Sequence, residues 1–194
     1  KEFSPKISFG CSISSKPHIA LSMLDNKKYL YRVDKNWEKM AIYYAMIKPE
    51  GKGNVMKLPF FNDPLVKFKF TNNDLAMLSD GLKKLCRILF SAGAKNIYTS
   101  IKNYGKISNK NEISRLPKRI SKYQTSLMTI HLFSSCPMGE NKNLYPTDSF
   151  GRLVGQKNLF VNDGSLLPSA PGVNPQGTIM AIARRNIYNL LSYV

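Results

Sequence analysis

The stretch VNDGSLLPSAPGVNPQGTIMAIARRN, residues 161–186, places much turn chemistry between a predicted strand and a predicted helix. An apolar run over 158–163 ends at Asp163-Gly164-Ser165, and prolines and small residues then lead to Asn174-Pro175. Asn followed by Pro is a good helix start, with Asn174 as the N-cap and Pro175 at the first helical position. We therefore predict a strand at 158–163, a loop, and a helix over 175–193.

Both ends of this loop are rich in backbone N–H groups without regular partners. The amides of Gln176, Gly177 and Thr178 have no acceptor within the predicted helix, and they carry partial positive charge that suits an anion or a polarised carbonyl. The turn at Asp163-Gly164-Ser165 supplies further amides. The pattern suits a site for a long polar ligand, and it is also what an ordinary strand exit and helix entry look like.

The rest of the chain combines strands with one strong helix. Alternation and β-branched or aromatic content predict strands at 28–34, 39–48, 53–58, 65–70, 95–101 and 126–133. A stripe at helical spacing predicts a helix that begins at Asn72 or Asn73 and ends at Gly93. This stripe consists of Leu75, Leu78, Leu82, Leu85 and Leu89. A short helical turn is expected at 115–122, and the whole pattern predicts an α+β fold.

The length and the net charge of the chain limit the number of domains and the kinds of partner that it can have. A chain of 194 residues suffices for one sizeable domain, or for one domain and part of another. The net charge of +17 suggests either a polyanion partner or a solvated lysine-rich surface. The lysines are scattered singly or in pairs, which favours the solvated surface. We therefore expect no nucleic-acid partner, and a basic polyanion-binding module stays as an alternative.

The cysteines and the apolar segments bear on the compartment. Cys11, Cys86 and Cys136 leave one thiol unpaired in any disulfide scheme, so a cytoplasmic or otherwise reducing compartment is expected. No apolar run is long enough for a transmembrane segment. The start KEFSPKISFG has neither an initiator Met nor an apolar signal core, which suggests a piece of a longer chain.

Candidates for acid–base chemistry are few, because the chain has two histidines. His18 is most simply a surface or partly packed side chain. His131 ends a predicted strand and precedes small residues that let a ligand approach the backbone, although a structural role is equally open. No metal-ligand motif, P-loop, GxSxG or strand-linked GxGxxG is present, so no metal site is predicted.

Four segments together resemble a known family. They are His131-Leu-Phe-Ser-Ser-Cys136-Pro-Met-Gly139, Gly151-Arg-Leu-Val-Gly155, the run from Asn158 to Pro168, and Gly172-Val-Asn174-Pro175-Gln-Gly-Thr178. Their order, spacing and identities over 131–186 resemble the C-terminal signature of the glucose–methanol–choline family of flavin oxidoreductases. Upstream, the strands and the long helix resemble that family's substrate domain more loosely.

The resemblance implies a division of the chain. Residues 1–145 would form the substrate-binding domain, with a largely antiparallel sheet packed with helices. Residues 146–194 would return to complete a flavin-binding α/β domain through a strand, a loop and a helix. The N-terminal Rossmann domain that carries most of the FAD site is absent from this sequence, so the chain alone is expected to be inactive.

The resemblance also implies roles for individual residues. Family members transfer a hydride from an alcohol carbon to N5 of FAD. His131 matches the catalytic histidine, which accepts the proton of the substrate hydroxyl or positions it. Asn174 matches the second member of the pair, where an amide would orient the hydroxyl. If Asn174 also caps its helix, these two tasks compete for one side chain.

The cofactor-binding residues implied by the resemblance fall in two groups. Asp163 and Gly164 match the turn near the FAD pyrophosphate and ribityl chain. Pro175, Gln176 and Thr178 match the segment whose backbone faces the flavin's pyrimidine edge, where its amides would stabilise negative charge on the ring. The expected substrate is a sterol, sugar, polyol or long-chain alcohol. An inactive truncated remnant of such an enzyme is the alternative.

Overall fold

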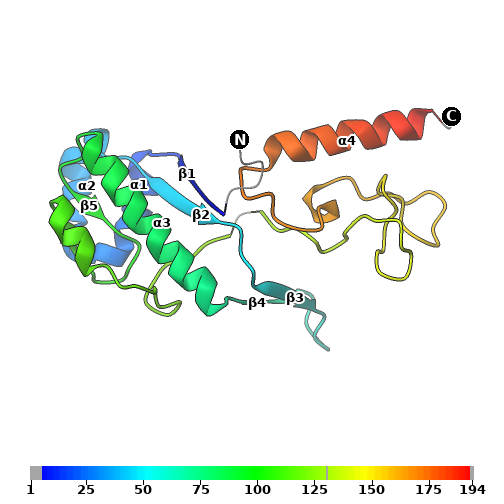
Figure 1. Ribbon diagram of the computed structural model, residues 1–194, viewed down its shortest axis with the longest axis horizontal. Helices are drawn as coiled ribbons and strands as arrows, with labels where there is room; N and C mark the ends of the chain where they lie inside the picture. The colour runs from blue at the N-terminus through cyan, green and yellow to red at the C-terminus, as the bar shows by residue number, and fades with distance from the viewer. Residues whose placement is uncertain (1–5, 130, 193–194) are drawn as a thin grey trace. The chain divides into compact units, whose positions relative to one another are not determined.

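The computed structural model describes residues 6–129 and 131–192, and it combines short strands with helices, as predicted for an α+β fold (Figure 1). The α-helices are α1 (Lys16–Ser22), α2 (Tyr31–Asn36), α3 (Asn72–Ser91) and α4 (Gln176–Leu191). The 3-10 helices are η1 (Met23–Tyr29), η2 (Trp37–Lys39), η3 (Lys110–Arg115) and η4 (Gly164–Leu166). The strands are β1 (Ile7–Cys11), β2 (Tyr43–Ile47), β3 (Lys52–Met56), β4 (Leu65–Lys69), β5 (Ile97–Tyr98) and β6 (Lys106–Ile107).

The chain divides into two compact units. The first contains the described residues up to Asn54 together with Val66–Met128, and the second contains Val55–Leu65 and the described residues from Thr129 onward. Within the described residues, the strands pair as β1–β2, β3–β4 and β5–β6, and each pair forms a two-stranded sheet. The expected antiparallel pairing is present in small two-stranded sheets, as in β1–β2 and β5–β6.

The long helix α3 packs closely on the β1–β2 sheet of the first unit. The two strands are antiparallel, and Ile7 lies opposite Ile47. A Cβ atom added at Gly81 of α3 would lie 3.3 Å from side-chain carbons of both Ile7 and Ala45. A glycine at this position therefore lets the helix backbone approach the sheet.

Two aliphatic clusters fill the first unit. One contains Cys86, Ile97, Ile101, Ile107, Ile113, Leu116 and Ile120. The predicted leucine stripe of α3 supplies Leu85 as a buried residue and packs Leu75, Leu78, Leu82 and Leu89 against this cluster. The second cluster consists of Ile19, Met23 and Val33, with Trp37 and Tyr98 packed against it. The prediction that the leucine stripe is core is confirmed.

The start of α3 differs in detail from the prediction. The N-cap is Thr71 rather than Asn72 or Asn73, and the hydroxyl of Thr71 accepts a hydrogen bond from the backbone N–H of Asp74 at 3.0 Å. The Asp74 carboxylate in turn accepts from the N–H of Thr71 at 2.8 Å. This capping box satisfies two amides at once, which a lone Asn cap does not do.

The strand predicted at 28–34 is wrong, because this segment is helical and spans the end of η1 and part of α2. Its tyrosines and valine have high strand propensity. Within this segment, however, Val33 is buried and packs against Ile19 and Met23. This burial on one side of a helical segment outweighs the local strand propensity. The strand predicted at 39–48 is shorter than expected and begins only at Tyr43.

Two later strands are also replaced by irregular backbone. In the segment predicted at 126–133, the described residues carry no regular strand, and Ile130 lies outside the described residues. In the segment predicted at 158–163, Phe160 forms one isolated bridge with Arg152. The helical turn predicted at 115–122 is instead η3, which ends at Arg115. Strands 53–58 and 65–70 are confirmed as β3 and β4, and 95–101 shortens to β5.

Candidate functional site

The segment that follows His131 is hydrogen-bonded along the turn that contains Asp163 and Gly164. The backbone N–H of Cys136 donates to the carbonyl of Ser165 at 3.2 Å, and that of Met138 donates to Leu166 at 3.0 Å. The Ser134 hydroxyl donates to the carbonyl of Pro168 at 3.1 Å. Two segments that the sequence singled out separately therefore lie side by side within the second unit.

Gly164 is the point where three segments of the second unit meet. A Cβ atom added there would lie 3.3 Å from Cδ1 of Ile179, in the first turn of α4. It would also lie 3.6 Å from Cε1 of Phe133 and 3.7 Å from the carbonyl oxygen of Leu132. The backbone next to His131, the turn after Asp163 and the start of α4 thus converge on one residue. A larger side chain would push them apart.

Asp163 shapes the turn itself. Its Oδ1 atom accepts hydrogen bonds from the backbone N–H of Ser165 at 2.8 Å and from the Ser165 hydroxyl at 2.5 Å. These bonds, the hydroxyl first and then the N–H, lower the pKa of Asp163 below its ordinary value. The carboxylate is therefore ionised at neutral pH and accepts hydrogen bonds without donating any.

The N-terminus of α4 is open to solvent. Helix α4 begins at Gln176 with Pro175 at the N-cap position, one residue later than predicted, so the expected Asn174 cap is wrong. The Pro175 carbonyl accepts the N–H of Ile179 at 2.8 Å, whereas the first-turn amides of Gln176, Gly177 and Thr178 lie before the first helical hydrogen bond. A Cβ atom added at Gly177 would have no neighbour within 4 Å. A polar ligand can therefore reach this helix end.

The two predicted catalytic side chains are both exposed. His131 precedes the residues that touch Gly164, and its ring centroid lies 6.3 Å from that of Phe133. Asn174 immediately precedes the N-cap of α4. The contacts at Gly164 thus join the neighbours of His131 to the helix that follows Asn174. Direct pairing of the two side chains stays a prediction.

A hydrogen-bond network that the sequence did not reveal fixes α4 to the segment before Asp163. The buried Asn186 donates from Nδ2 to Oδ1 of Asn162 at 3.1 Å and accepts from Nη2 of Arg185 at 3.0 Å. The Arg185 guanidinium also lies over the Phe150 ring, 4.9 Å from its centroid. A polar residue on the inner face of a helix was the available signal, because buried amides need partners.

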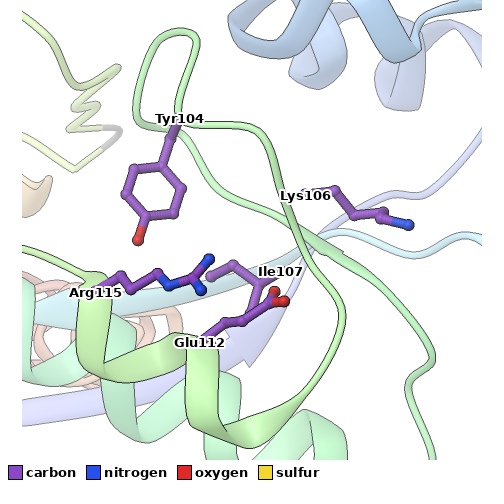
Figure 2. A pocket seen from close by; sticks show the side chains of 5 residues that line it. All are labelled: Tyr104, Lys106, Ile107, Glu112 and Arg115. Carbon is purple, nitrogen blue, oxygen red and sulfur yellow. The ribbon is translucent and has the colours of Figure 1, made fainter.

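The first unit contains a separate hollow of about 280 Å³, lined by Tyr104, Lys106, Ile107, Glu112 and Arg115 (Figure 2). None of the predicted site residues lines it. The Glu112 carboxylate accepts hydrogen bonds from the Ser108 N–H at 2.8 Å and from the Asn109 side chain at 3.1 Å. Burial raises the pKa of Tyr104, and the nearby Arg115 opposes this shift. The acidic residue of this hollow, Glu112, therefore fixes the loop at Ser108 and Asn109 through these hydrogen bonds.

The described residues also contain no cluster of three or more His, Cys, Asp or Glu side chains placed to hold a metal ion. Across the same residues, none of the helices combines the length and apolar character needed to cross a bilayer. The second unit also contains a hollow of about 370 Å³, lined by Asp148, Phe150, Arg152, Phe160 and Asn189, and none of the predicted site residues lines it.

The sequence of this chain is similar to that of a known family. Residues 57–183 match the sequence model described as GMC oxidoreductase, which stands for glucose–methanol–choline. The chain is 40% identical over 193 residues to the uncharacterised GMC-type oxidoreductase y4nJ of Sinorhizobium fredii, covering 99% of this chain and 38% of that protein.

Two further relatives have named activities. The long-chain-alcohol oxidase FAO1 of Arabidopsis thaliana is 31% identical over 165 residues, which cover 75% of this chain and 21% of the plant protein. A cholesterol oxidase of Acinetobacter baumannii is 39% identical over 57 residues, 29% of this chain and 10% of that protein. The chain thus spans well under half the length of each of these relatives.

Proposed function

Because the chain belongs to the GMC oxidoreductase family, whose members are generally flavoproteins, we propose that it is the catalytic C-terminal part of an FAD-dependent oxidoreductase acting on the CH–OH groups of alcohols. The observation that carries this proposal is the convergence at Gly164. The residue after His131, the Asp163 turn and the open end of α4 come together there without a side chain at the meeting point.

The residues around Gly164 have the chemistry that would be needed to hold a flavin. The first-turn amides of α4 point positive dipole ends out of the helix, so the N–H groups of Gln176 and Thr178 would hold the electron-rich pyrimidine edge of the ring, while Pro175, which has no N–H, would fix the start of the helix beside it. The ionised Asp163 suits a hydroxyl donor of the ribityl chain, and Gly164 lets the segment after His131 and the start of α4 pack closely on this turn. When bound, FAD supplies the acceptor for the hydride removed from the alcohol carbon.

His131 and Asn174 would act on the substrate hydroxyl. The exposed imidazole of His131 accepts the hydroxyl proton as the carbon gives up its hydride, because a neutral imidazole is the side chain best matched to that task near pH 7. The Asn174 amide orients the hydroxyl and stays neutral.

A flavin-binding region is the proposed partner of this chain. Helix α4 exposes Met180, Ile187 and Leu191, which lie on one face at spacings of seven and four residues, together with Tyr188. We assign this stripe to contact with the flavin-binding α/β region, which residues 146–194 would help complete. Residues 1–145 would then shape the substrate pocket. Without that partner, the chain is expected to neither bind FAD tightly nor turn over.

A long-chain alcohol is the substrate class that the relatives favour. FAO1 aligns along 75% of this chain and is named as a long-chain-alcohol oxidase, whereas the cholesterol oxidase aligns along 29%. These activities are those of the two relatives. For this chain they rank a long-chain alcohol ahead of a sterol, with sugars and polyols behind both.

The decisive experiment replaces each of the two histidines in turn, in the complete enzyme that contains this chain. We expect His131→Ala to slow anaerobic flavin reduction by about 10²- to 10⁴-fold, the usual contribution of a positioned acid or base. Flavin content, read from the visible spectrum, should not change. The matched control is His18→Ala, because His18 is exposed and its Nδ1 contacts the Ser15 hydroxyl at 2.6 Å in α1.

Three outcomes separate the alternatives. Equal rates for His131→Ala and the parent would contradict the proposed role of His131. A complete chain that binds flavin but is not reduced by any alcohol would favour an inactive remnant. If the protein instead binds heparin near physiological salt with a steep salt dependence, the polyanion-binding module gains support from the net charge of +17.

A further inference from the structure

The loop that joins β3 to β4 presents two aromatic side chains to solvent. Phe60 is 105% exposed and Phe61 is 65% exposed. The φ angle of Phe60 is 67°, in the left-handed region where Gly or Asn fits at lower cost. An aromatic ring held outward on strained backbone stabilises nothing in the folded chain itself. Such a feature indicates a binding role.

The strands beside this loop have one face without charge and one that carries Lys52, Lys67 and Lys69 together with Met56 and Leu65. A Cβ atom added at Gly53 would lie 3.3 Å from the Phe68 ring, so these two residues share a face. Because side chains alternate along strands, Val55 and Val66 lie on that face as well. Val55 is 61% exposed, Val66 53% and Phe68 42%. An isolated two-stranded hairpin is only marginally stable in water, so we expect its apolar face to contact another surface.

The net charge of the hairpin indicates what kind of surface would contact it. Residues 52–69 contain Lys52, Lys57, Lys67 and Lys69 but only one carboxylate, Asp63, which gives a local net charge of 4 − 1 = +3. All four lysines are exposed. A second copy of the chain would bring a second set of these lysines against the first, so self-association is opposed by like charge. A surface that is both anionic and apolar would complement the lysines as well as the apolar face of the hairpin.

We propose that this hairpin docks on the surface of an anionic phospholipid bilayer. Phe60 and Phe61 enter the boundary between headgroups and acyl chains, and the flanking lysines pair with lipid phosphates and carboxylates. The proposal rests on the proposed function in one respect. A long-chain alcohol partitions into a bilayer, so an enzyme that docks there meets its substrate at high local concentration.

The test measures co-sedimentation of the full chain with phosphatidylcholine vesicles, with and without phosphatidylserine. We expect binding to the vesicles that contain phosphatidylserine, and at least a tenfold weakening in Phe60→Ser/Phe61→Ser. The matched control is Tyr123→Ser, because Tyr123 is an aromatic side chain 77% exposed and follows a lysine. This control should bind as the parent does.

The lysines are tested separately. Lys67→Gln/Lys69→Gln should weaken binding to the anionic vesicles by about tenfold or more, since each basic residue near such a surface is worth about fivefold. Binding to pure phosphatidylcholine should not change. Lys118→Gln/Lys122→Gln removes the same charge from exposed positions outside the hairpin and should bind nearly as the parent does.

A fluorescence measurement follows insertion directly. Trp37 is the single tryptophan, so Phe60→Trp in a Trp37→Phe background reports on the loop alone. Its emission should shift to the blue on anionic vesicles and be quenched by lipids brominated on their acyl chains. An emission that stays unquenched, or a parent chain that leaves all vesicles in the supernatant, overturns the proposal.

Two further results also overturn it. One is equal weakening in Tyr123→Ser and in the phenylalanine variant, and the other is a dimer in sedimentation velocity that Phe60→Ser/Phe61→Ser dissociates. Vesicle binding requires neither flavin nor turnover, whereas flavin reduction by a short, water-soluble alcohol requires no vesicle. The failure of this inference and the failure of the proposed function are therefore distinguishable.

Discussion

Different interactions stabilise each of the two units of this chain. Of the thirteen buried hydrophobic side chains among the described residues, eleven belong to the first unit, and Leu166 and Leu167 belong to the second. The second unit instead relies on backbone hydrogen bonds between loops, on positive-φ glycines and on buried polar residues such as Thr147 and Asn186. Packing of aliphatic side chains therefore stabilises the first unit, whereas backbone geometry contributes more in the second.

The largest effect is expected from a cavity in the first unit. Ile107 is 1% exposed and lies in the larger aliphatic cluster. Ile107→Ala should lower the free energy of unfolding by about 3–4 kcal/mol, the usual cost of lost burial plus a residual cavity. Urea unfolding followed by Trp37 fluorescence measures it, because Trp37 packs within the same unit.

The matched control for this change is Ile88→Ala. Ile88 lies on α3 and is half exposed, so its truncation should cost less than about 1 kcal/mol. Equal losses at Ile107 and Ile88 would contradict the idea that packing of buried aliphatic side chains stabilises the first unit.

The next effect tests backbone geometry in the second unit. Gly151 has a φ of 84°, and an added Cβ atom would lie 2.2 Å from the carbonyl oxygen of Val161. Gly151→Ala should therefore cost about 2–4 kcal/mol through left-handed strain and a backbone clash. Amide hydrogen exchange along α4 measures this loss, since Gly151 also lies beside Asn186 of that helix.

Gly155 supplies a control that separates the two causes. Its φ is 80°, yet an added Cβ atom would have no neighbour within 4 Å. Gly155→Ala should thus cost about 1–2 kcal/mol from the left-handed conformation alone. If the two alanine variants lose the same stability, the close approach to Val161 is unimportant and the comparison between the units weakens.

A smaller effect comes from a buried carboxylate in the first unit. Burial alone would raise the pKa of Asp74, but hydrogen bonds from the N–H groups of Thr71, Glu50 and Gly51 lower it overall. A depressed folded-state pKa stabilises the fold above the unfolded pKa, near 4, and this stabilisation is lost as pH falls through the folded value. Asp74→Ala should cost about 1–2 kcal/mol at pH 7.

The pH dependence supplies the control for Asp74. Asp74→Asn keeps the size of the side chain but cannot ionise. Its unfolding free energy should therefore depend less on pH below about pH 4 than that of the parent. A parent and an Asn variant with the same acid dependence would contradict the role of the carboxylate.

The sequence predicted elements whose signals are local. The leucines of α3 and the alternation of Val66, Phe68 and Lys67 each repeat with one clear period, and both elements are present. The segment 28–34 was mispredicted because its tyrosines and valine favour a strand locally, whereas burial of Val33 beside Ile19 and Met23 depends on residues outside the segment. The segment 158–163 forms one isolated bridge, at Phe160, since propensity does not say whether a strand finds a neighbour.

The candidate site shows the same division. The Asp163 turn and the helix start near Pro175 could be predicted, because turn and cap residues act on their own neighbours. The convergence at Gly164 could not be predicted from local pattern, because it depends on Leu132, Phe133 and Ile179, which are distant in sequence. The resemblance grouped these segments into one signature, and the roles that it implies for His131, Asn174 and the cofactor-binding residues stay predictions.

The smallest effect on stability should come from Asp163, the carboxylate that shapes the turn in the second unit. Its pKa is lowered by the Ser165 hydroxyl and then by the Ser165 N–H, so its contribution is present above about pH 4 and is lost on acidification. Because the side chain is exposed, Asp163→Ala should cost less than about 1 kcal/mol. Chemical denaturation at pH 7 measures this loss.

The same variant sharpens the comparison when flavin affinity is measured in the complete enzyme. If the second unit is built for a ligand, Asp163→Ala should weaken flavin binding by tenfold or more, although its stability barely changes. Asp74→Ala, corrected for unfolded protein, should leave that affinity unchanged, because Asp74 anchors α3 in the first unit. Flavin retained equally by both variants would mean that the Asp163 turn serves the fold alone, as Asp74 does.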